Sequence, residues 1–496
     1  MGRLDISKIV IGRKKFTIPF KIPLVNAVKP LQCNKLLRFI PGSRAVFSGL
    51  WGETRVVAKL FFKPFRYKKH AKKEITGNEL LKKASIPTSS ILYSGFSKEL
   101  QSHILIFEFI ESSINFGEMV AFNPHVKSGD LKDAGLQKLT QSLKDTHGKY
   151  LTLLVKLIAK MHQNGLIHND LHPGNFLLKD DTIYVLDGAS IRQASATRPL
   201  QKKNSLENLS ILLSQINLQD KRLFNEFVRA YAGSRNYHNA DQVKYILEKF
   251  IAKSHRLRTA RYLKKIYRSS TQIICRKSFS SFMLCHREYY TAEMKSFLQN
   301  PDIAFQNSDT KFLKTGNTAT LILHKIDGVE FVVKRYNMKN ILYALRRAFK
   351  KSRADISWYS SHLLIRNRIN TPKPAAIKEV RFGPFRNKAF FICEYIKGES
   401  ARHLFNDAKA DDVKIPAESV IDGFYKFKSS MISHGDMKAT NIIIKDNLSF
   451  FIDLDSMKWH KSRFGFARAC KKDMKRFMKS WENNPQISKL FNNLQQ

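Results

Sequence analysis

The sequence lacks the features of a secreted or membrane-spanning protein. Its five cysteines are scattered, odd in number and never arranged as Cys-x-x-Cys, so a disulfide framework or a zinc site is not expected. No stretch approaches the roughly eighteen apolar residues of a spanning helix. The first residues include Asp5 and hold no sustained apolar run, which argues against a signal peptide. We therefore expect a cytoplasmic protein whose contact with any membrane is peripheral.

Acidic residues are scarce. The chain of 496 residues contains 41 Asp and Glu against 86 Lys and Arg, a formal net charge of +45. Such an excess raises the local concentration of anionic partners, and nucleic acid, an anionic membrane face or a phosphorylated substrate would each fit. The apolar fraction of 43% is normal for a folded chain, and the length favours two domains.

A glycine-rich phosphate loop is missing as well, yet the chain contains an internal repeat. Residues 168–175 read His-Asn-Asp-Leu-His-Pro-Gly-Asn, and residues 434–441 read His-Gly-Asp-Met-Lys-Ala-Thr-Asn. An apolar run follows each segment and ends in an aspartate, Asp187 or Asp453. The interval between the two copies is the same at all three polar positions, which chance does not readily produce.

A second matched feature lies upstream of each segment. Residues 55–61 and 330–336 have the composition of strands, with Lys59 and Lys334 near their ends. Turn-prone stretches precede both strands. The order strand, helix, strand, helix, loop, strand thus occurs twice, which predicts two domains of one kind.

The His-x-Asp-x-x-x-x-Asn spacing is typical of phosphotransferases of the protein-kinase-like superfamily. Phosphoryl transfer depends on positioning, on divalent metal ions that bridge the phosphates, and on a carboxylate that accepts the hydroxyl proton. In this interpretation ATP and Mg²⁺ are the cofactors, and Asp170 and Asp436 are the bases. Lys59 and Lys334 are expected to neutralise the phosphates. The predicted metal ligands are oxygen donors, as hard cations prefer: Asn175, Asp187, Asn441 and Asp453.

The predicted fold class is α+β, with two tandem protein-kinase-like bilobal domains. Each is expected to have a small β-rich lobe and a larger helical lobe. We expect an N-terminal segment at 1–35, a first domain at 36–240 and a second at 305–496. Residues 241–304 have helical periodicity with many basic and aromatic residues, and are expected to form a basic helical connector.

In such domains a carboxylate usually fixes the strand lysine. Glu79 is the candidate partner of Lys59, with Glu74 as the rival. In the second domain His362 stands at the position of Glu79, and Asp355 is the nearest acid. We therefore expect the first domain to be active and leave open whether the second is.

With these motifs the chain resembles the bacterial lipopolysaccharide kinases that phosphorylate heptose or Kdo sugars of the inner core, as a tandem-domain member. The resemblance covers most of residues 36–496. It implies an ATP-dependent sugar kinase that acts on the lipopolysaccharide core at the inner face of the bacterial inner membrane. The segments that carry it are Lys59, Glu79, 168–175 and 186–188 in the first domain, and 353–374, 434–441 and 452–455 in the second.

The chain departs from regulated protein kinases at several positions. Asn169 and Gly435 stand where those enzymes carry arginine, and no Ala-Pro-Glu segment follows either metal-binding aspartate. Control by activation-loop phosphorylation and a peptide-docking groove are therefore not expected. Lys438 is expected to contact the transferred phosphate of ATP, whereas its counterpart is His172. This difference leaves open whether the two domains share an acceptor.

Basic clusters occur at residues 66–69, 346–351 and 463–479. They fit attraction to an anionic membrane surface or to lipopolysaccharide, although solvated helix faces have the same composition. Surfaces that combine basic and aromatic residues also bind nucleic acid, which is a less favoured partner here.

Two other functions stay open. One is a protein- or RNA-associated atypical kinase of the Rio-like kind. The other is a partly non-catalytic pseudokinase scaffold, which His362 and the missing glycine loops favour. The acceptor hydroxyl depends on the shape of the pocket, and the sequence does not give that shape.

Overall fold

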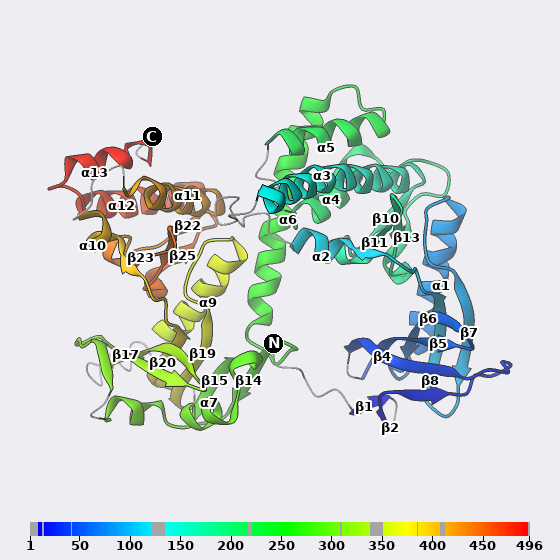
Figure 1. Ribbon diagram of the computed structural model, residues 1–496, viewed down its shortest axis with the longest axis horizontal. Helices are drawn as coiled ribbons and strands as arrows, with labels where there is room; N and C mark the ends of the chain where they lie inside the picture. The colour runs from blue at the N-terminus through cyan, green and yellow to red at the C-terminus, as the bar shows by residue number, and fades with distance from the viewer. Residues whose placement is uncertain are drawn as a thin grey trace. The chain divides into compact units, whose positions relative to one another are not determined.

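The chain divides into two compact units (Figure 1). We call Arg3–Leu257 the first unit, and Arg258–Gln496 together with Met1–Gly2 the second unit. Both combine an antiparallel sheet with helices, in agreement with a mixed α and β class. None of the helices in the described ranges is both long and apolar enough to cross a membrane. The computed structural model describes residues 8–11, 14–40, 42–121, 134–216, 221–307, 310–337, 351–383, 385–406 and 412–494.

The small lobe of the first unit is a six-stranded antiparallel sheet in the order β3-β4-β5-β6-β8-β7. One helix, α1 (Tyr67–Lys83), packs against β6 and β8. On β6 the residues Val56, Ala58 and Leu60 are buried, so the alternation of the strand turns Lys59 to the opposite face. The strands are β3 (Phe20–Ile22), β4 (Leu31–Ile40), β5 (Arg44–Trp51), β6 (Thr54–Phe61), β7 (Ile91–Ser97) and β8 (Ser102–Glu108), preceded by a hairpin of β1 (Lys8–Ile11) and β2 (Lys14–Thr17).

The large lobe of the first unit is mainly helical. The long helix α3 (Ala134–Gln163) buries Leu154, Ile158 and Met161, which recur at helical spacing. Gly165 follows the helix with a φ of 69°, a left-handed conformation that glycine adopts without strain. The other elements are β9 (Ile114–Asn115), α2 (Phe116–Ala121), β10 (Leu166–His168), β11 (Phe176–Lys179), β12 (Thr182–Val185), β13 (Ile191–Gln193), α4 (Lys202–Leu213), α5 (Lys221–Ser234) and α6 (Ala240–Lys265).

The second unit repeats this plan. Its sheet has seven antiparallel strands in the order β14-β15-β19-β20-β18-β17-β16, and α9 (Arg353–Arg366) packs on β19 and β20. The strands are β14 (Ile273–Lys277), β15 (Ser281–His286), β16 (Lys311–Lys314), β17 (Ala319–Ile326), β18 (Val329–Tyr336), β19 (Pro374–Phe382) and β20 (Phe385–Glu394). The other elements are α7 (Ala292–Phe297), β21 (Glu399–Ser400), α10 (Ala401–Asn406), α11 (Lys414–Ser430), β22 (Ile432–Ser433), β23 (Ile442–Lys445), β24 (Leu448–Phe451), β25 (Lys458–Trp459), α12 (Arg463–Lys479) and α13 (Pro485–Leu490).

The stretch 241–304 differs from the expected helical connector. Helix α6 occupies its first part, and the division between the units falls within this helix. The strands β14 and β15 then join the second sheet, where β15 pairs with β19. Strand β19 lies about a hundred residues further along the chain than β15. Local periodicity does not indicate pairing between strands so far apart in sequence. The first sheet likewise includes Phe20–Ile22, ahead of the expected start at residue 36.

Candidate active sites

In the first unit the strand lysine is bound by a helix carboxylate. The Nζ atom of Lys59 on β6 forms an ion pair with Oε1 of Glu74 on α1, and only 1% of the Glu74 side chain is exposed. The partner is thus the rival candidate, whereas Glu79 is exposed on the same helix. The two acids are five residues apart on α1, so they lie on different faces of that helix. The lysine also lies 4.9 Å from the centre of the Phe107 ring.

Glu74 also holds the loop that carries Asp187, the predicted metal ligand of the first unit. Its Oε1 accepts a hydrogen bond of 3.0 Å from the backbone N–H of Gly188. The helix and the loop approach so closely that a Cβ on Gly77 would lie 1.8 Å from the carbonyl oxygen of Gly188. Glycine is therefore required at position 77, and one carboxylate connects the sheet, the helix and the loop.

Asp187 follows β12 in a left-handed conformation with a φ of 61°. Its Oδ2 accepts a hydrogen bond of 2.9 Å from the hydroxyl of Ser190. Burial raises the pKa of this carboxyl, but the charge of Lys59 and the hydrogen bond from Ser190 outweigh burial, so its pKa lies below the usual value. The aspartate is therefore ionised at neutral pH, as a metal ligand must be.

The predicted base of the first unit, Asp170, is exposed in the loop after β10. The side-chain amide of Asn175 donates a hydrogen bond of 2.8 Å to the backbone carbonyl of Asp170. The carbonyl of Asn175 in turn accepts from the backbone N–H of Leu186, also at 2.8 Å. A further amide, that of Asn208 on α4, donates to the carbonyl of His168 and fixes the start of the loop.

The second unit binds its strand lysine differently. The Nζ atom of Lys334 on β18 lies 2.5 Å from Oδ1 of Asp453 and 2.9 Å from Oδ2 of Asp455. The guanidinium of Arg353, at the start of α9, lies 2.9 Å from the same Oδ2 of Asp455. Burial raises the pKa of Asp453, and the charge of Lys334 outweighs that effect and lowers it below the usual value.

His362 and Asp355, the two residues considered as partners of Lys334, contact other residues instead. His362 is buried and accepts or donates a hydrogen bond of 2.8 Å with the hydroxyl of Tyr262, and its ring stacks on that of His286 at 5.1 Å. Asp355 accepts a hydrogen bond of 2.5 Å from the hydroxyl of Tyr267. His362, which stands at the position of Glu79, therefore does not pair with Lys334, and Asp455 takes that place.

The second predicted base, Asp436, is surrounded by cations. Its Oδ1 lies 2.7 Å from Nη1 of Arg476, and its Oδ2 lies 3.2 Å from Nζ of Lys438. The amide of Asn441 donates to the carbonyl of Asp436 at 2.9 Å, as Asn175 does in the first unit. The buried carboxylate of Asp473 on α12 accepts from the backbone N–H of His434 at 2.7 Å.

The residues at both sites fit a magnesium ion with a nucleotide. Each asparagine amide donates through Nδ2 to the base loop. Its Oδ1 is an acceptor, and an oxygen of this kind is one that Mg²⁺ takes as a ligand. Within the described ranges, no three His, Cys, Asp or Glu side chains gather to hold a metal by themselves. Mg²⁺ commonly takes one or two carboxylates and completes its shell with phosphate oxygens and water, so the donors present suffice.

The three basic clusters of the sequence lie in different structural surroundings. Arg66, Lys68 and Lys69 are exposed at and just before the start of α1. The cluster at 346–351 falls outside the described residues except for Lys351. Residues 463–479 form α12, which has two distinct faces. One face reaches the predicted catalytic loop through the contacts of Asp473 with His434 and of Arg476 with Asp436.

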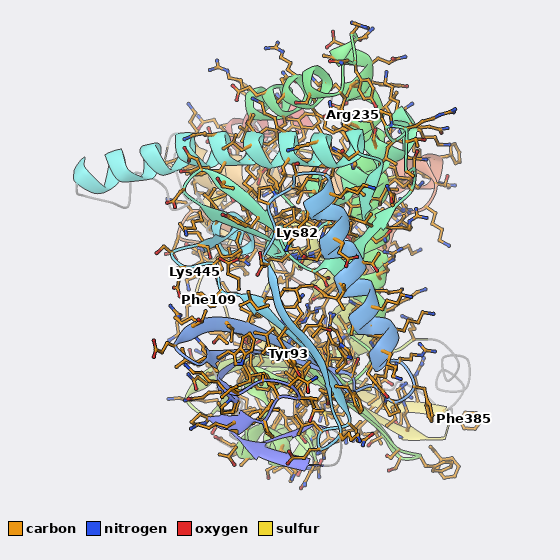
Figure 2. All side chains as sticks on the ribbon, turned by 90° about the vertical axis from the view of Figure 1, so that its right-hand side faces the viewer. Lys82, Tyr93, Phe109, Arg235, Phe385 and Lys445 are labelled. Atoms are coloured by element: carbon orange, nitrogen blue, oxygen red, sulfur yellow. The ribbon has the colours of Figure 1, made fainter. Side chains whose placement is uncertain are left out.

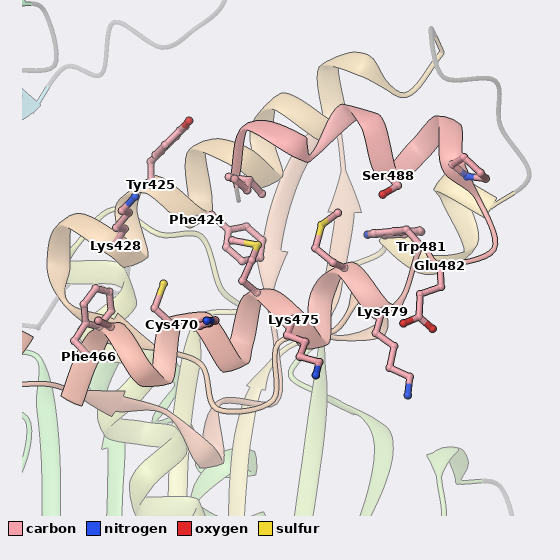
Figure 3. A pocket seen from close by; sticks show the side chains of 16 residues that line it. Phe424, Tyr425, Lys428, Phe466, Cys470, Lys475, Lys479, Trp481, Glu482 and Ser488 are labelled. Atoms are coloured by element: carbon pink, nitrogen blue, oxygen red, sulfur yellow. The ribbon is translucent and has the colours of Figure 1, made fainter. Parts of the chain in front are cut away.

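The other face of α12 lines a groove with α11 and α13 (Figure 3). Phe424 and Trp481 contribute aromatic surface, and Lys475 and Lys479 extend outward from α12 beside it. Of the described residues that line this groove, none belongs to the predicted catalytic set. The groove is therefore separate from the phosphotransfer chemistry considered above.

The fold of each unit is a twisted antiparallel sheet with one helix, followed by a larger lobe whose short hairpins carry the predicted loops. No protein family model matches the chain, and no curated protein matches it. Among the solved structures that match, one is WaaP in complex with acyl carrier protein. It covers 45% of this chain and 88% of its own, at 16% identity and a TM-score of 0.32. The functional conclusion therefore depends on the residues of the two sites.

Proposed function

We propose that the chain is an ATP- and Mg²⁺-dependent kinase that phosphorylates heptose or Kdo sugars of the lipopolysaccharide inner core. The observation that carries the proposal is a pair of hydrogen bonds that occurs in both units. One bond joins the asparagine amide to the carbonyl of the base, Asn175 to Asp170 and Asn441 to Asp436. The other joins the carbonyl of the same asparagine to the residue before the metal-binding aspartate. The same two hydrogen bonds thus connect the loop of the proposed base to the loop of the proposed metal ligand in both units.

The residues of the first unit divide the work as follows. Lys59, held by Glu74, binds phosphate oxygens of the nucleotide from the sheet side. Asp187 and the amide oxygen of Asn175 hold Mg²⁺, which neutralises phosphate charge when it is bound. Asp170 accepts the proton of the acceptor hydroxyl as its oxygen attacks the γ-phosphorus and ADP leaves.

The acceptor follows from the motif resemblance and from the charge. A net charge of +45 favours an anionic acceptor, and the lipopolysaccharide core is anionic. We place the reaction at the inner face of the bacterial inner membrane, with two kinase-like domains in tandem. Lys334, Asn441, Asp453 and Asp436 then play the corresponding parts in the second domain, and Lys438 contacts the transferred phosphate.

The direct test measures phosphate on core sugars in cells by mass spectrometry. The variants are Asp170→Asn, Asp436→Asn and the double substitution, with Asp180→Asn in an exposed turn as the matched control. We expect at least a roughly hundredfold loss of core phosphorylation in the double variant, because a general base commonly contributes that much. Unchanged core phosphate in the double variant would overturn the proposal. Transfer of labelled phosphate to protein or RNA, with none to lipopolysaccharide, would favour the Rio-like alternative.

A second candidate concerns the second unit alone. Both carboxylate oxygens of Asp436 are engaged by cations, whereas no ion pair of Asp170 is found within the described residues. This difference favours a unit that binds nucleotide and organises the enzyme without transferring phosphate. The single variants separate the two cases. If the second unit is such a scaffold, Asp436→Asn leaves core phosphorylation intact while Asp170→Asn abolishes it.

A further inference from the structure

Two hairpin turns lie side by side at one end of the second sheet. Phe279 lies in the turn between β14 and β15, while Phe382 is the last residue of β19 and Phe385 the first residue of β20 at the neighbouring turn. The backbone N–H of Gly383 donates a hydrogen bond of 2.9 Å to the carbonyl of Phe279. A second bond of 2.8 Å runs from the N–H of Arg381 to the carbonyl of Ser280. The turns therefore form one continuous structure, which we call the phenylalanine tip (Phe279, Phe382 and Phe385).

The three aromatic side chains of the phenylalanine tip are exposed. Phe279 is 64% exposed, Phe382 is 70% exposed and Phe385 is 41% exposed. The rings of Phe279 and Phe382 meet edge to face, with centres 5.0 Å apart. Figure 2 shows Phe385 at the outer end of its hairpin, pointing away from the ribbon. Adjacent exposed phenylalanines are unfavourable in water, because their rings have no polar group to hydrate, so such a cluster marks a contact surface.

The two hairpin segments that carry the phenylalanine tip, residues 276–281 and 378–388, contain mostly basic charged residues. The only acid between residues 276–281 and 378–388 is Glu379, and it is buried beneath Arg381 and Arg386. Arg276 and Lys277 are exposed on β14 just before the turn that carries Phe279, whereas Lys388 is exposed on β20 and pairs with Asp302 at 2.9 Å. An anionic partner would therefore meet cations at the rim and apolar rings at the centre.

We propose that the phenylalanine tip inserts into the interfacial region of an anionic lipid bilayer. The rings are exposed at the ends of two hairpins, so they suit a surface that yields, whereas a folded protein partner would have to offer a matching cavity. Its rings carry no hydrogen-bonding groups, which suits the boundary between headgroups and acyl chains. The rim cations would then lie at the level of lipid phosphates. The backbone bonds hold the two turns together, and the rings of Phe279 and Phe382 already contact each other, so little order is lost on insertion.

This inference names the membrane-contacting surface for the proposed location at the inner membrane, but it does not depend on phosphate transfer. The test is co-sedimentation of the full chain with vesicles of phosphatidylglycerol and phosphatidylcholine, compared with vesicles of phosphatidylcholine alone. The test variant is Phe279→Ser with Phe382→Ser. The matched control is Phe464→Ser, which removes an 83% exposed phenylalanine from α12.

We expect the double variant to bind the anionic vesicles at least about tenfold more weakly, because two apolar side chains leave the interface. Phe464→Ser should bind as the parent does. In Phe382→Trp the new indole should shift its emission to the blue on anionic vesicles and be quenched by brominated acyl chains. The parent protein, with its four tryptophans, supplies the baseline.

Several outcomes would overturn the inference. The double variant could bind the anionic vesicles as tightly as the parent, or Phe464→Ser could lose as much vesicle binding as the double variant. Brominated lipid could also fail to quench the indole of Phe382→Trp. A double variant that loses affinity for an RNA oligonucleotide while keeping vesicle binding would assign the tip to nucleic acid instead. Phosphorylation of a detergent-dispersed acceptor should be unchanged in the double variant, so failure of the proposed kinase activity is seen separately.

Discussion

Asp455 binds Lys334 from the loop after β24, two residues beyond Asp453, the predicted metal ligand. The Nζ–Oδ2 distance is 2.9 Å, and only 4% of the Asp455 side chain is exposed. In the first unit the carboxylate that binds Lys59 comes from helix α1 instead. The same ion pair thus has its acid on different elements in the two units.

The helix contributes charges of opposite sign in the two units. In the first, Glu74 on α1 binds the strand lysine and the loop N–H of Gly188. In the second, Arg353 on α9 binds the loop carboxylate of Asp455, which in turn binds the strand lysine. Each arrangement joins sheet, helix and loop through one carboxylate, so both keep the lysine near the loop of the aspartate that is predicted to bind metal.

The first prediction separates Glu74 from Glu79 by nucleotide binding. Glu74→Gln should weaken binding of a fluorescent ATP analogue to the first unit by about tenfold or more, because a nearly buried charge pair is broken. Glu79→Gln should bind as the parent does, since Glu79 is exposed. Titrations are made in a chain whose second unit carries Lys334→Met. A larger loss in Glu79→Gln than in Glu74→Gln would contradict the assignment.

The second prediction concerns Asp455. In a chain whose first unit carries Asp187→Asn, we expect Asp455→Asn to weaken nucleotide binding about tenfold. The substitution should also cost about 3 kcal/mol of stability, because Lys334 and Arg353 lose a buried partner. The matched control is Asp446→Asn in the exposed turn between β23 and β24. Equal binding and equal urea midpoints in both variants would show that Asp455 does not position the lysine.

The third prediction concerns the close approach of Gly77 to the loop. Gly77→Ala places a methyl group 1.8 Å from the carbonyl oxygen of Gly188, so helix and loop must separate. We expect a loss of about 3 kcal/mol of stability and loss of nucleotide binding by the first unit. Gly233→Ala on α5 meets nothing within 4 Å and should stabilise the chain by about 0.5 kcal/mol. Equal melting temperatures of the two variants would contradict this packing.

The fourth prediction is a loss of stability of the second unit at mildly acid pH. Burial lowers the pKa of His362 to about 3 and that of His286 to about 4. Both pKa values lie below that of a histidine in the unfolded chain, about 6.5. At pH values between the folded and the unfolded pKa, the unfolded state therefore binds more protons than the folded state. The stability is complete above about pH 6.5 and falls as the pH drops toward 4 and then 3. At pH 5 each histidine should cost about 2 kcal/mol.

Urea unfolding followed by tryptophan fluorescence checks this, because three of the four tryptophans lie in the second unit. His362→Gln should reduce the difference in stability between pH 8 and pH 5. His238→Gln, an exposed histidine of the first unit, should leave that difference unchanged. An equal pH dependence in all three proteins would rule out the buried pair as its source.

Much of each site could be read from the sequence, because its chemistry lies in short, contiguous segments. Asp170 with Asn175, and Asp436 with Asn441, belong to single loops whose spacing fixes which groups can meet. The structure joins each pair by a hydrogen bond from the asparagine amide to the carbonyl of the aspartate. The sequence also indicated that Lys59 and Lys334 lie on strands. Alternation of apolar residues predicts a strand without knowledge of the strand that pairs with it.

The partners of those lysines could not be read in the same way. Glu74 and Glu79 are both acids on one amphipathic helix, and only the rotation of α1 against the sheet selects Glu74. Asp455 lies within the quoted segment 452–455, but its role depends on the distance to Lys334, which is 121 residues away in sequence. Contacts of such separation depend on packing, and local patterns do not encode them.

The sequence by itself therefore determined the repeat, the order of elements and the identity of the loop residues, because these depend on local spacing and periodicity. The tertiary structure decided which carboxylate binds each lysine, that Arg476 reaches Asp436, and that β14 and β15 belong to the second sheet. It also brought Phe279 beside Phe382, about a hundred residues later. The physical reason is that ion pairs, strand pairing and ring contacts depend on distance in space, which only the folded packing fixes.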